Sequence, residues 1–411
     1  MLDGVDFSSC PRVTKPYGGT DRKFGVLYNG DTYMLKFAQS HAKKGDSSTS
    51  HINNVVSEYI SSHIAQSVGI DAHSTLLGTY KDEIVVACKD FRKVGDENIE
   101  FEELMLAKFD KDEIKRFAKL SQIYDIYNDS SLIPVPLRKA AIDAYWDIFV
   151  IDALVGNFDR HIGNWGFLVN QNVLRIAPAY DFGSTLLPTL SDEGVCDPSK
   201  TEGKNLLERC FVFPSPKMYI TKEKTGKVGY YDMLASGYDI NCSEALLRIA
   251  PRIDLKKIDS IIDNTPYITD VRKEFYKRYI KARKSYIIDL PHRFISDGKR
   301  DLEALKRVTT GDRFDITLLN EKYEFLSQID PTVLSIRNAT ATSVDYIESV
   351  EYKGYIADVY NDRIVIKNPS GSEKLITDMD VVDFIYSEDD LQDYLEEYVN
   401  NLNRDYDDLD R

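Results

Sequence analysis

The chain has 411 residues, of which 43% are hydrophobic and 29% charged, and its formal net charge at pH 7 is −15. These proportions are those of an ordinary folded protein and exclude disorder along the whole chain, while the length predicts two or three domains. The longest nearly apolar run, YWDIFVIDALVG, is interrupted by two Asp and falls well short of the roughly 20 residues that a membrane helix needs.

The N-terminus, MLDGVDFSSCPRV, has neither the basic nor the apolar region of a secretory signal. The five Cys form no C-x-x-C pair, and the six His lack the spacing of metal ligands. We therefore expect reduced thiols, no structural metal and a cytoplasmic location, with export as an effector left open as an alternative.

Charge is concentrated near the end of the chain. Residues 371–411 contain fourteen Asp and Glu against three Lys and Arg, which gives −11 and leaves −4 for the other 370 residues. Because an acidic segment repels nucleic acid and anionic membranes, neither is an expected partner. The segment is predicted to be either a solvated terminus or a docked appendage.

The first predicted elements are a hairpin and a helix. Residues 24–38 consist of two alternating apolar runs joined by Asn-Gly, the strongest short signal for a β-hairpin. Residues 52–69 have apolar side chains at helical spacing, with Ser50 available as a cap and Gly69 as the end. Residues 73–91 predict a second pair of strands. We therefore expect a small antiparallel sheet with one helix in a first lobe, residues 1–92.

Helices dominate the predicted second lobe, residues 93–330. The clearest are at 137–157 and 268–290, and between them a short hairpin runs into Asp181. Residues 331–411 change character, with strands predicted in YIADVYNDRIVIKN, and we treat them as a C-terminal appendage. The predicted fold class is α+β, with the two lobes of a protein-kinase-like fold: a small antiparallel-sheet lobe and a large helical lobe.

The segment GNFDRHIGNWGFL carries most of the predicted chemistry. Within it, Asp159 and Asn164 have the D-x-x-x-x-N spacing of a kinase catalytic loop, and Asp-Phe-Gly follows at Asp181. Phosphoryl transfer needs an Asp beside the attacking hydroxyl and oxygen ligands for a metal that bridges the phosphates. We therefore predict Asp159 as catalytic and Asn164 and Asp181 as Mg²⁺ ligands.

The first lobe supplies the other predicted parts of an ATP site. Lys36 ends a strand and would contact the phosphates, while Glu58 on the next helix could pair with Lys36; both are assigned to catalysis. The predicted ATP-binding residues of the phosphate loop and of the strand that would meet adenine are Gly18, Gly19, Thr20, Cys88, Lys89, Asp90 and Phe91. Each signal alone is weak, because such residues are common on surfaces and in turns. Their joint order along the chain favours a kinase.

These residues resemble a known family. GNFDRHIGNWGFL, APAYDFGSTLLP, YGGTDRKFGVLYNGDTYMLKF and SEYISSHIAQSVGI together resemble the HipA-like serine/threonine kinases of bacteria, most closely their CtkA-type branch, over about residues 15–300. The resemblance implies the same roles for Asp159, Asn164, Asp181 and Lys36. His161 matches the family's His and is placed at the ATP site, where bracing the loop is its preferred role.

Two departures from the family pattern stand out. Many members carry a Lys before the metal-binding Asn, where this chain has Gly163. Many also carry regulatory serines in the phosphate loop, where this chain has Pro16 and Gly18, so control by phosphorylation of that loop is left open, with Thr14 and Thr20 as nearby hydroxyls.

The sequence thus predicts a serine/threonine protein kinase that transfers the γ-phosphoryl group of ATP with Mg²⁺ to a protein substrate. One alternative is a different transfer or a non-protein substrate on the same scaffold. A second is a non-catalytic, toxin–antitoxin-type binding protein with an antitoxin-like partner. The complete set of Lys36, Asp159, Asn164 and Asp181 favours the enzyme, because a binding protein does not require all four.

Overall fold

The structure is a computed structural model. It describes residues 4–14, 22–38, 40–41, 50–51, 53–111, 114, 118–197, 201, 206, 209–211, 214–219, 229–237, 239–296, 348–353, 355–359, 364–369, 372–376 and 395. The chain divides into two compact units, Met1–Glu324 and Phe325–Arg411, and each is described by itself. Within the described residues, no helix has the length and apolar character to cross a membrane.

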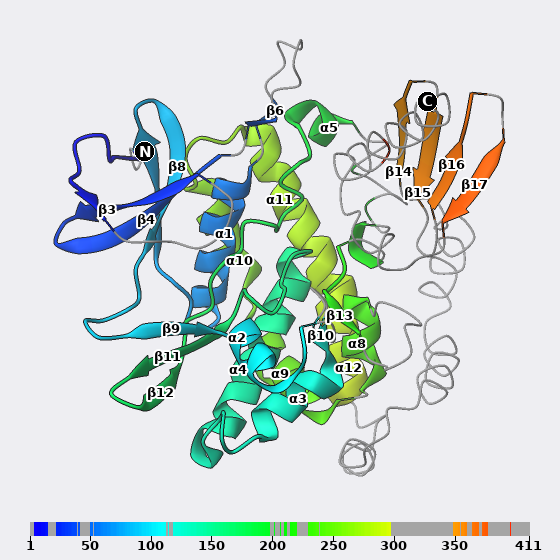
Figure 1. The fold of residues 1–411 in the computed structure, drawn as a ribbon. Coiled ribbons are helices and arrows are strands. Elements are labelled where there is room, and N and C mark those ends of the chain that lie inside the picture. The colour runs from blue at the N-terminus through cyan, green and yellow to red at the C-terminus, as the bar shows by residue number, and fades with distance from the viewer. Residues whose placement is uncertain are drawn as a thin grey trace, which may run out of the picture. The chain divides into compact units, whose positions relative to one another are not determined.

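The first unit begins with a six-stranded sheet (Figure 1). Its order is β1-β7-β8-β4-β3-β2, and all pairs are antiparallel except β1 with β7. The strands are β1 (Val5–Asp6), β2 (Arg12–Val13), β3 (Lys23–Tyr28), β4 (Asp31–Phe37), β7 (Thr75–Tyr80) and β8 (Glu83–Lys89). The predicted hairpins are confirmed as β3–β4 and β7–β8, whereas β1 and β2, with two residues each, were not predicted.

Turn chemistry explains both hairpins. Asn29 and Gly30 have φ of 50° and 84°, and Lys81 and Asp82 have φ of 50° and 67°, so each two-residue turn is left-handed at both positions. The inward side chains of the sheet alternate along β4 as Tyr33, Leu35 and Phe37, and they pack with residues of β3 and β8 in one apolar core. This periodicity fixes the register that places Lys36 on the opposite face.

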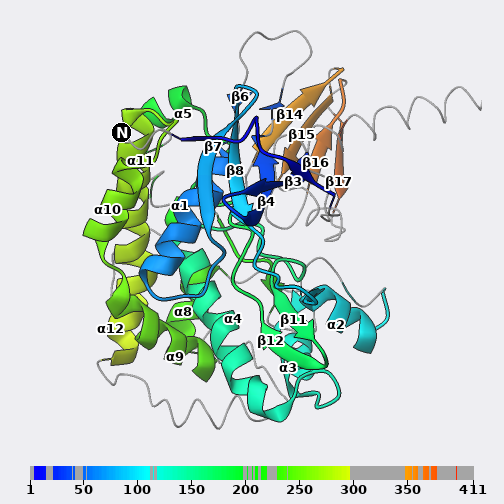
Figure 2. The ribbon, with the colours of Figure 1, turned by 90° about the vertical axis from the view of Figure 1, so that its left-hand side faces the viewer.

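Helix α1 (Asn54–Ser67) joins the sheet to the helical part of the unit. It packs against β7 and β8 on one side and against α4 and α10 on the other (Figure 2). The helix was predicted, but its cap was not: Asn53 occupies the N-cap position and Ser50 lies in the two-residue strand β6 (Ser50–His51), paired with β5 (Ser40–His41). The apolar periodicity predicted where the helix lies. Its cap was missed because Ser50 pairs with β5 in strand β6 and is not next to the first turn.

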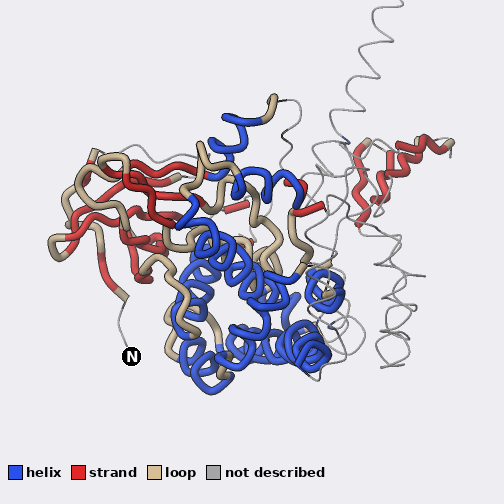
Figure 3. The backbone as a smooth tube through the Cα atoms, turned by 90° about the horizontal axis from the view of Figure 1, so that it is seen from below, coloured by secondary structure: helices blue, strands red, loops and turns tan. Residues whose placement is uncertain are grey.

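The other helices in the described part of the first unit lie beside the sheet (Figure 3). They are α2 (Phe101–Lys108), α3 (Leu120–Asn128), α4 (Val135–Val155), α5 (Asp192–Cys196), α8 (Tyr230–Ser236), α9 (Ile240–Ile249), the 3₁₀ turn η1 (Ala250–Arg252), α10 (Leu255–Asp263), α11 (Asp270–Arg283), the π-helical turn η2 (Lys284–Asp289) and α12 (Leu290–Ser296). The last three are consecutive, so the helix predicted at 268–290 continues to Ser296.

Helix α4 is buried on every side along its second half, where residues 148–155 are all buried and Asp152 is the one charged residue among them. It ends at Gly156, which has φ of 69° as the left-handed C-cap. A Cβ on this glycine would lie 2.3 Å from the Tyr279 hydroxyl of α11 and 3.2 Å from Pro214, so only glycine fits. The chain that follows is thereby directed into the predicted catalytic loop.

Two smaller sheets complete the first unit. Strands β9 (Glu97–Glu100), β11 (Gly166–Asn170) and β12 (Val173–Ile176) form an antiparallel sheet in the order β12-β11-β9. The β11–β12 hairpin is the one predicted between the catalytic loop and Asp181. Strands β10 (Ala118–Lys119) and β13 (Met218–Tyr219) form a short parallel pair.

The second unit contains a four-stranded antiparallel sheet in the order β14-β15-β16-β17. Its strands are β14 (Glu348–Tyr352), β15 (Tyr355–Val359), β16 (Ile364–Lys367) and β17 (Glu373–Ile376). The strands predicted in YIADVYNDRIVIKN are β15 and β16. Most of the acidic end of the chain lies outside the described residues, so its predicted character stays a prediction.

The parallel β1–β7 pairing depends on the absence of a side chain at Gly78. A Cβ there would lie 2.0 Å from the Val5 carbonyl oxygen and 2.7 Å from the Phe7 ring. Gly78→Ala is therefore expected to lower the free energy of unfolding by about 1–3 kcal/mol, measured by urea denaturation. Thr79→Ala, which trims a side chain on the same strand, is the control, and an equal effect of the two changes would contradict the pairing.

Candidate active site

The expected ion pair between Lys36 and Glu58 is present. The Lys36 ammonium on β4 lies 2.8 Å from Glu58 Oε2 on α1, and it also lies 2.7 Å from Asp181 Oδ1. Lys36 thus joins the sheet, helix α1 and the Asp-Phe-Gly segment through one nitrogen. The Lys36 and Glu58 side chains are 16% and 1% exposed, whereas Asp181 is 41% exposed and accessible to a ligand.

Glu58 is held by two further donors that the sequence did not reveal. Its Oε1 accepts from the backbone N–H of Phe182 at 2.9 Å and lies 2.9 Å from His73 Nε2. His73 is buried and also contacts the Ser62 hydroxyl of α1 at 2.9 Å. Both carboxylate oxygens of Glu58 therefore have partners, which fixes the position of Lys36 relative to Asp181.

The three charges stabilise one another despite burial. Burial alone would raise the pKa of Glu58, but the Lys36 charge and the His73 hydrogen bond hold that pKa well below its usual range. Burial likewise opposes ionisation of Asp181, yet Lys36 lowers the pKa of this carboxyl. Burial would lower the pKa of Lys36, and the two carboxylates raise it well above its usual value. All three groups are therefore charged at neutral pH.

Arg160, the residue after Asp159, organises the catalytic loop. Its Nε donates to Asp152 Oδ2 on α4 at 2.7 Å and its Nη2 to Oδ1 at 3.1 Å, and both side chains are buried. Its Nη1 donates to the backbone carbonyls of Asn164, at 2.9 Å, and of Tyr180. One guanidinium thus fastens the end of the catalytic loop and the residue before Asp181 to the same helix.

The two predicted metal ligands are positioned by these bonds. The Asn164 side-chain nitrogen donates to the Asp159 carbonyl at 2.7 Å, which leaves its side-chain oxygen for a cation. Asp181 has φ of 63°, a left-handed conformation in which its carboxylate meets Lys36 while the next N–H meets Glu58. Amide and carboxylate oxygens are ligands that Mg²⁺ accepts, so this donor set fits that ion.

Backbone pairing joins the segment before Asp181 to the entry of β7. The Ala179 N–H donates to the Asp71 carbonyl at 2.7 Å, and the His73 N–H donates to the Ala179 carbonyl at 2.9 Å. Ala72 and Ala179 form a parallel β-bridge between them. The segment 71–73, which carries His73, is therefore tied directly to the chain that leads into Asp181.

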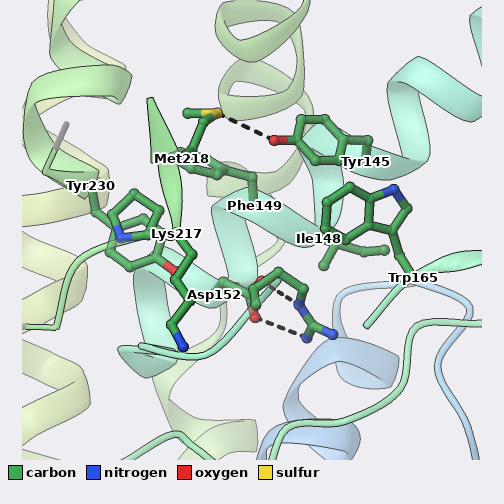
Figure 4. Close-up of a pocket in the computed structure, with 10 residues that line it drawn as sticks. Tyr145, Ile148, Phe149, Asp152, Trp165, Lys217, Met218 and Tyr230 are labelled. Carbon is green, nitrogen blue, oxygen red and sulfur yellow. Dashed lines mark hydrogen bonds and ion pairs between the residues drawn. The ribbon is translucent and has the colours of Figure 1, made fainter. Parts of the chain in front are cut away.

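The predicted catalytic carboxylate of Asp159 contacts an unexpected cation. The Lys217 ammonium forms an ion pair with Asp159 Oδ1, although the two residues are 58 positions apart. The Lys217 side chain is 3% exposed and that of Asp159 27%. Lys217 lies at the edge of a pocket lined mostly by apolar side chains, among them Phe149, Met218 and Tyr230 (Figure 4).

His161 and Gly163 shape the middle of the loop. The His161 Nδ1 accepts from the Gly163 N–H at 3.1 Å, a contact that braces the turn. A Cβ on Gly163 would lie 3.1 Å from the His161 ring and 3.3 Å from a Glu100 carboxylate oxygen. A longer side chain at this position would crowd both groups. The predicted contact of His161 with ATP stays a prediction.

The strand predicted to meet adenine is β8, which lies between β7 and β4 in the sheet. The Lys89 N–H donates to the Ser74 carbonyl at 2.8 Å and the Asp90 N–H to the Thr32 carbonyl at 2.9 Å, while Cys88 pairs with a strand on each side. Within the described part of the chain, no group accepts from the Phe91 N–H, so Phe91 is the remaining candidate donor. Its ring stacks on Tyr180 with centroids 5.7 Å apart.

The predicted site residues and the residues that the structure brings together at the site differ in part. Gly18, Gly19 and Thr20 lie outside the described residues, so their contact with phosphate stays a prediction. His73, Asp152, Arg160 and Lys217 were not predicted as parts of the site. Arg160 lies inside the quoted motif and could have been found there, whereas Lys217, in PSPKMY, carries no local signal.

A sheet with a buried Lys–Glu pair, joined to a helical part that carries Asp-x₄-Asn and Asp-Phe-Gly, defines a protein-kinase-like phosphotransferase. The family model described as "HipA-like C-terminal domain" matches residues 16–224. The serine/threonine-protein kinase CtkA of Helicobacter pylori is 39% identical over 293 residues, which are 70% of this chain and 87% of that protein. The chain therefore belongs to the HipA-like family, and it is an enzyme of the serine/threonine protein kinase class.

Solved structures agree with this family. The crystal structure of the H. pylori proinflammatory kinase CtkA matches with a TM-score of 0.64 and 37% identity, covering 70% of this chain and 97% of that one. This match confirms the predicted α+β kinase-like fold. HipA of Shewanella oneidensis, solved with HipB and operator DNA, matches with a TM-score of 0.39 and 15% identity over 74% of this chain and 68% of that one. That likeness supports no argument here.

Asp152→Asn should strongly destabilise the protein, because it leaves the Arg160 guanidinium buried without its counter-charge. We expect a loss of about 3–5 kcal/mol in the free energy of unfolding, measured by urea denaturation. Asp147→Asn on the same helix is the matched control, since its partner Arg248 is 28% exposed, and should cost under about 1 kcal/mol. Equal losses would show that the buried pair has no special role.

The lowered pKa of Glu58 predicts a pH-dependent contribution to stability. The unfolded chain binds the Glu58 proton near the ordinary pKa of 4.5, before the folded protein does. The contribution of ionised Glu58 to the free energy of unfolding is therefore complete above pH 4.5. It is lost on acidification, by up to about 1.4 kcal/mol per pH unit.

Glu58→Gln removes this dependence. The difference in unfolding free energy between wild type and variant should narrow as the pH falls below 4.5. Urea denaturation along a pH series measures it, with Glu102→Gln, exposed on α2, as the control. A difference that stays constant across the series would mean that Glu58 is not ionised in the folded protein.

Proposed function

We propose that this kinase transfers the γ-phosphoryl group of ATP to a serine or threonine hydroxyl of a protein, with Mg²⁺ as the resident metal ion. The observation that carries the proposal is the Lys36–Glu58–Asp181 chain, which Arg160 links through the carbonyls of Tyr180 and Asn164 to the loop that carries Asp159. The relationship to CtkA supports serine and threonine as acceptors.

Each residue has a distinct task in this proposal. Lys36, oriented by Glu58, contacts the phosphates of ATP, and the Phe91 N–H donates to adenine. The Asn164 side-chain oxygen and the Asp181 carboxylate would hold Mg²⁺, which would neutralise charge on the phosphates. Asp159 accepts a hydrogen bond from the acceptor hydroxyl and takes its proton as the new bond to phosphorus forms. Catalysis then rests mainly on positioning and charge neutralisation.

One rearrangement accompanies binding. The Asp181 carboxylate is paired with Lys36, at 2.7 Å, so in this proposal Asp181 would leave that contact to hold Mg²⁺ and Lys36 would turn to the phosphates. Glu58 keeps Lys36 in place through this exchange, because its own position is fixed by His73 and the Phe182 N–H. The exchange conserves the number of charge pairs around Lys36.

Two variants separate catalysis from metal binding. Asp159→Asn should abolish transfer, because the amide cannot take the proton, yet leave Mg·ATP affinity within about threefold, under roughly 0.7 kcal/mol. Asp181→Asn should lower the Mg²⁺-dependent part of ATP affinity, since it removes a charged ligand of the metal. Calorimetry with and without Mg²⁺ gives the affinities, and mass spectrometry of the products gives the transfer.

The same experiment tests the alternatives. Phosphate on serine or threonine in the wild type, absent in Asp159→Asn, supports the proposal. AMP on the product would indicate nucleotide transfer instead, and full activity in Asp159→Asn would reject Asp159 as the catalytic residue.

A further inference from the structure

The cation beside Asp159 is not one that the catalytic loop supplies. Residues 159–164 contain two basic side chains, Arg160 and His161. Arg160 is bonded to Asp152 and to two backbone carbonyls, and the His161 Nδ1 accepts a hydrogen bond, which a protonated ring cannot do. The positive charge at the Asp159 carboxylate comes from Lys217.

The chain holds Lys217 in place from both sides. Pro214 and Pro216 precede it and restrict the backbone, and Pro214 packs against Gly156 at the end of α4. Directly after it, β13 pairs in register with β10, and Met218 accepts a hydrogen bond from the Tyr145 hydroxyl at 3.3 Å. The residue is therefore anchored by its neighbours, independently of the ion pair.

The Lys217 stem lies in apolar surroundings while its ammonium does not. Figure 4 shows the side chain extending away from Met218 and toward the end of the pocket where Asp152 lies. With 3% of the side chain exposed, the ammonium has lost most of its water, a cost that its contact with Asp159 offsets. A charge fixed in such surroundings acts more strongly on a neighbouring charge than one in water.

We propose that Lys217 is a catalytic residue of the phosphoryl transfer, an inference that rests on the function proposed above. An ammonium on one oxygen of the Asp159 carboxylate is about 8 Å at most from a hydroxyl oxygen bonded to the other carboxylate oxygen, and about 6 Å at most if both share one oxygen. In this proposal the phosphoryl group approaches that hydroxyl on the side that the ammonium faces. Lys217 contacts its oxygens there and neutralises the charge that develops on them.

The step balances without a further reactant. The bond between the γ-phosphorus and its bridging oxygen breaks, and ADP leaves with that electron pair. The acceptor oxygen forms the new bond to phosphorus, and its proton passes to Asp159. Lys217 keeps its own proton throughout, and its hydrogen bond shifts from the carboxylate to the phosphoryl oxygens as Asp159 becomes neutral.

Lys217→Met tests this role, because methionine keeps the apolar stem and removes the charge. The expected result is a fall in kcat of about 100-fold, with KM for ATP changed less than about threefold, since the contact forms in the transition state. Phosphate transfer to casein is measured by mass spectrometry. Lys108→Met, which removes a lysine paired with Asp129 at 2.8 Å, is the matched control and should keep wild-type activity.

A binding readout separates this role from a structural one. ADP with aluminium fluoride mimics the transferring group, and its affinity should fall at least about tenfold in Lys217→Met while the affinity for ADP alone is unchanged. Lys217→Arg, which keeps the charge, should recover part of both losses. Lys217→Gln, which keeps a hydrogen bond to Asp159, replaces the methionine variant in both assays if that variant does not fold.

The outcomes are distinct. An active wild type with an equally active or faster Lys217→Met overturns the role of Lys217 alone, and a faster variant would mean that the ammonium blocks Asp159. A wild type that neither transfers phosphate nor binds the analogue overturns the proposed function and the role of Lys217 together. Equal losses of affinity for ADP and for the analogue would show that Lys217 only supports the fold.

Discussion

The buried pair between Arg160 and Asp152 is the interaction on which the active site depends. A guanidinium taken out of water requires a counter-charge and acceptors for its remaining N–H groups. Asp152 supplies the first from the last turn of α4, and the backbones of Asn164 and Tyr180 supply the second. Because residues 148–155 of α4 are all buried, the loop is fastened to a packed part of the interior. A buried ion pair by itself contributes little net stability. The effect of this pair is to position the chain at Asn164 and Tyr180.

A second chain of charges crosses from the sheet to the helices. Lys36 lies on the sheet, Glu58 on α1 and Asp181 after the β11–β12 hairpin, and Lys36 and Glu58 would each be costly to bury alone. Their attraction to each other, and that of Asp181 for Lys36, offsets this cost, so the correct approach of the two lobes is favoured by electrostatics as well as by apolar packing. His73 supports this chain, because its Nε2 lies 2.9 Å from Glu58 Oε1 and so helps to fix the carboxylate that holds Lys36.

Local patterns predicted much of this structure, and the failures have physical reasons. Asn-Gly in the first hairpin and the apolar run of α4 act over a few residues, and the Asp-x₄-Asn spacing places both groups on one loop, so each could be predicted from neighbouring residues. Strands β1 and β2 are too short to show alternation and exist because the sheet offers them an edge. His73 and Lys217 gain their roles from partners 15 and 58 residues away, at Glu58 and Asp159, a relation that no local spacing encodes.

The bridge between Ala72 and Ala179 determines how the two lobes can move. It joins the entry of β7 to the chain leading into Asp181 by main-chain hydrogen bonds on both sides of Ala179, and these cannot adapt as side chains do. A rotation that separates the lobes at the bridge would break both of these hydrogen bonds together. A rotation about an axis through the bridge leaves them intact. Any motion of the two lobes that keeps these bonds therefore turns about the bridge, and the Asp-Phe-Gly segment stays with the entry of β7.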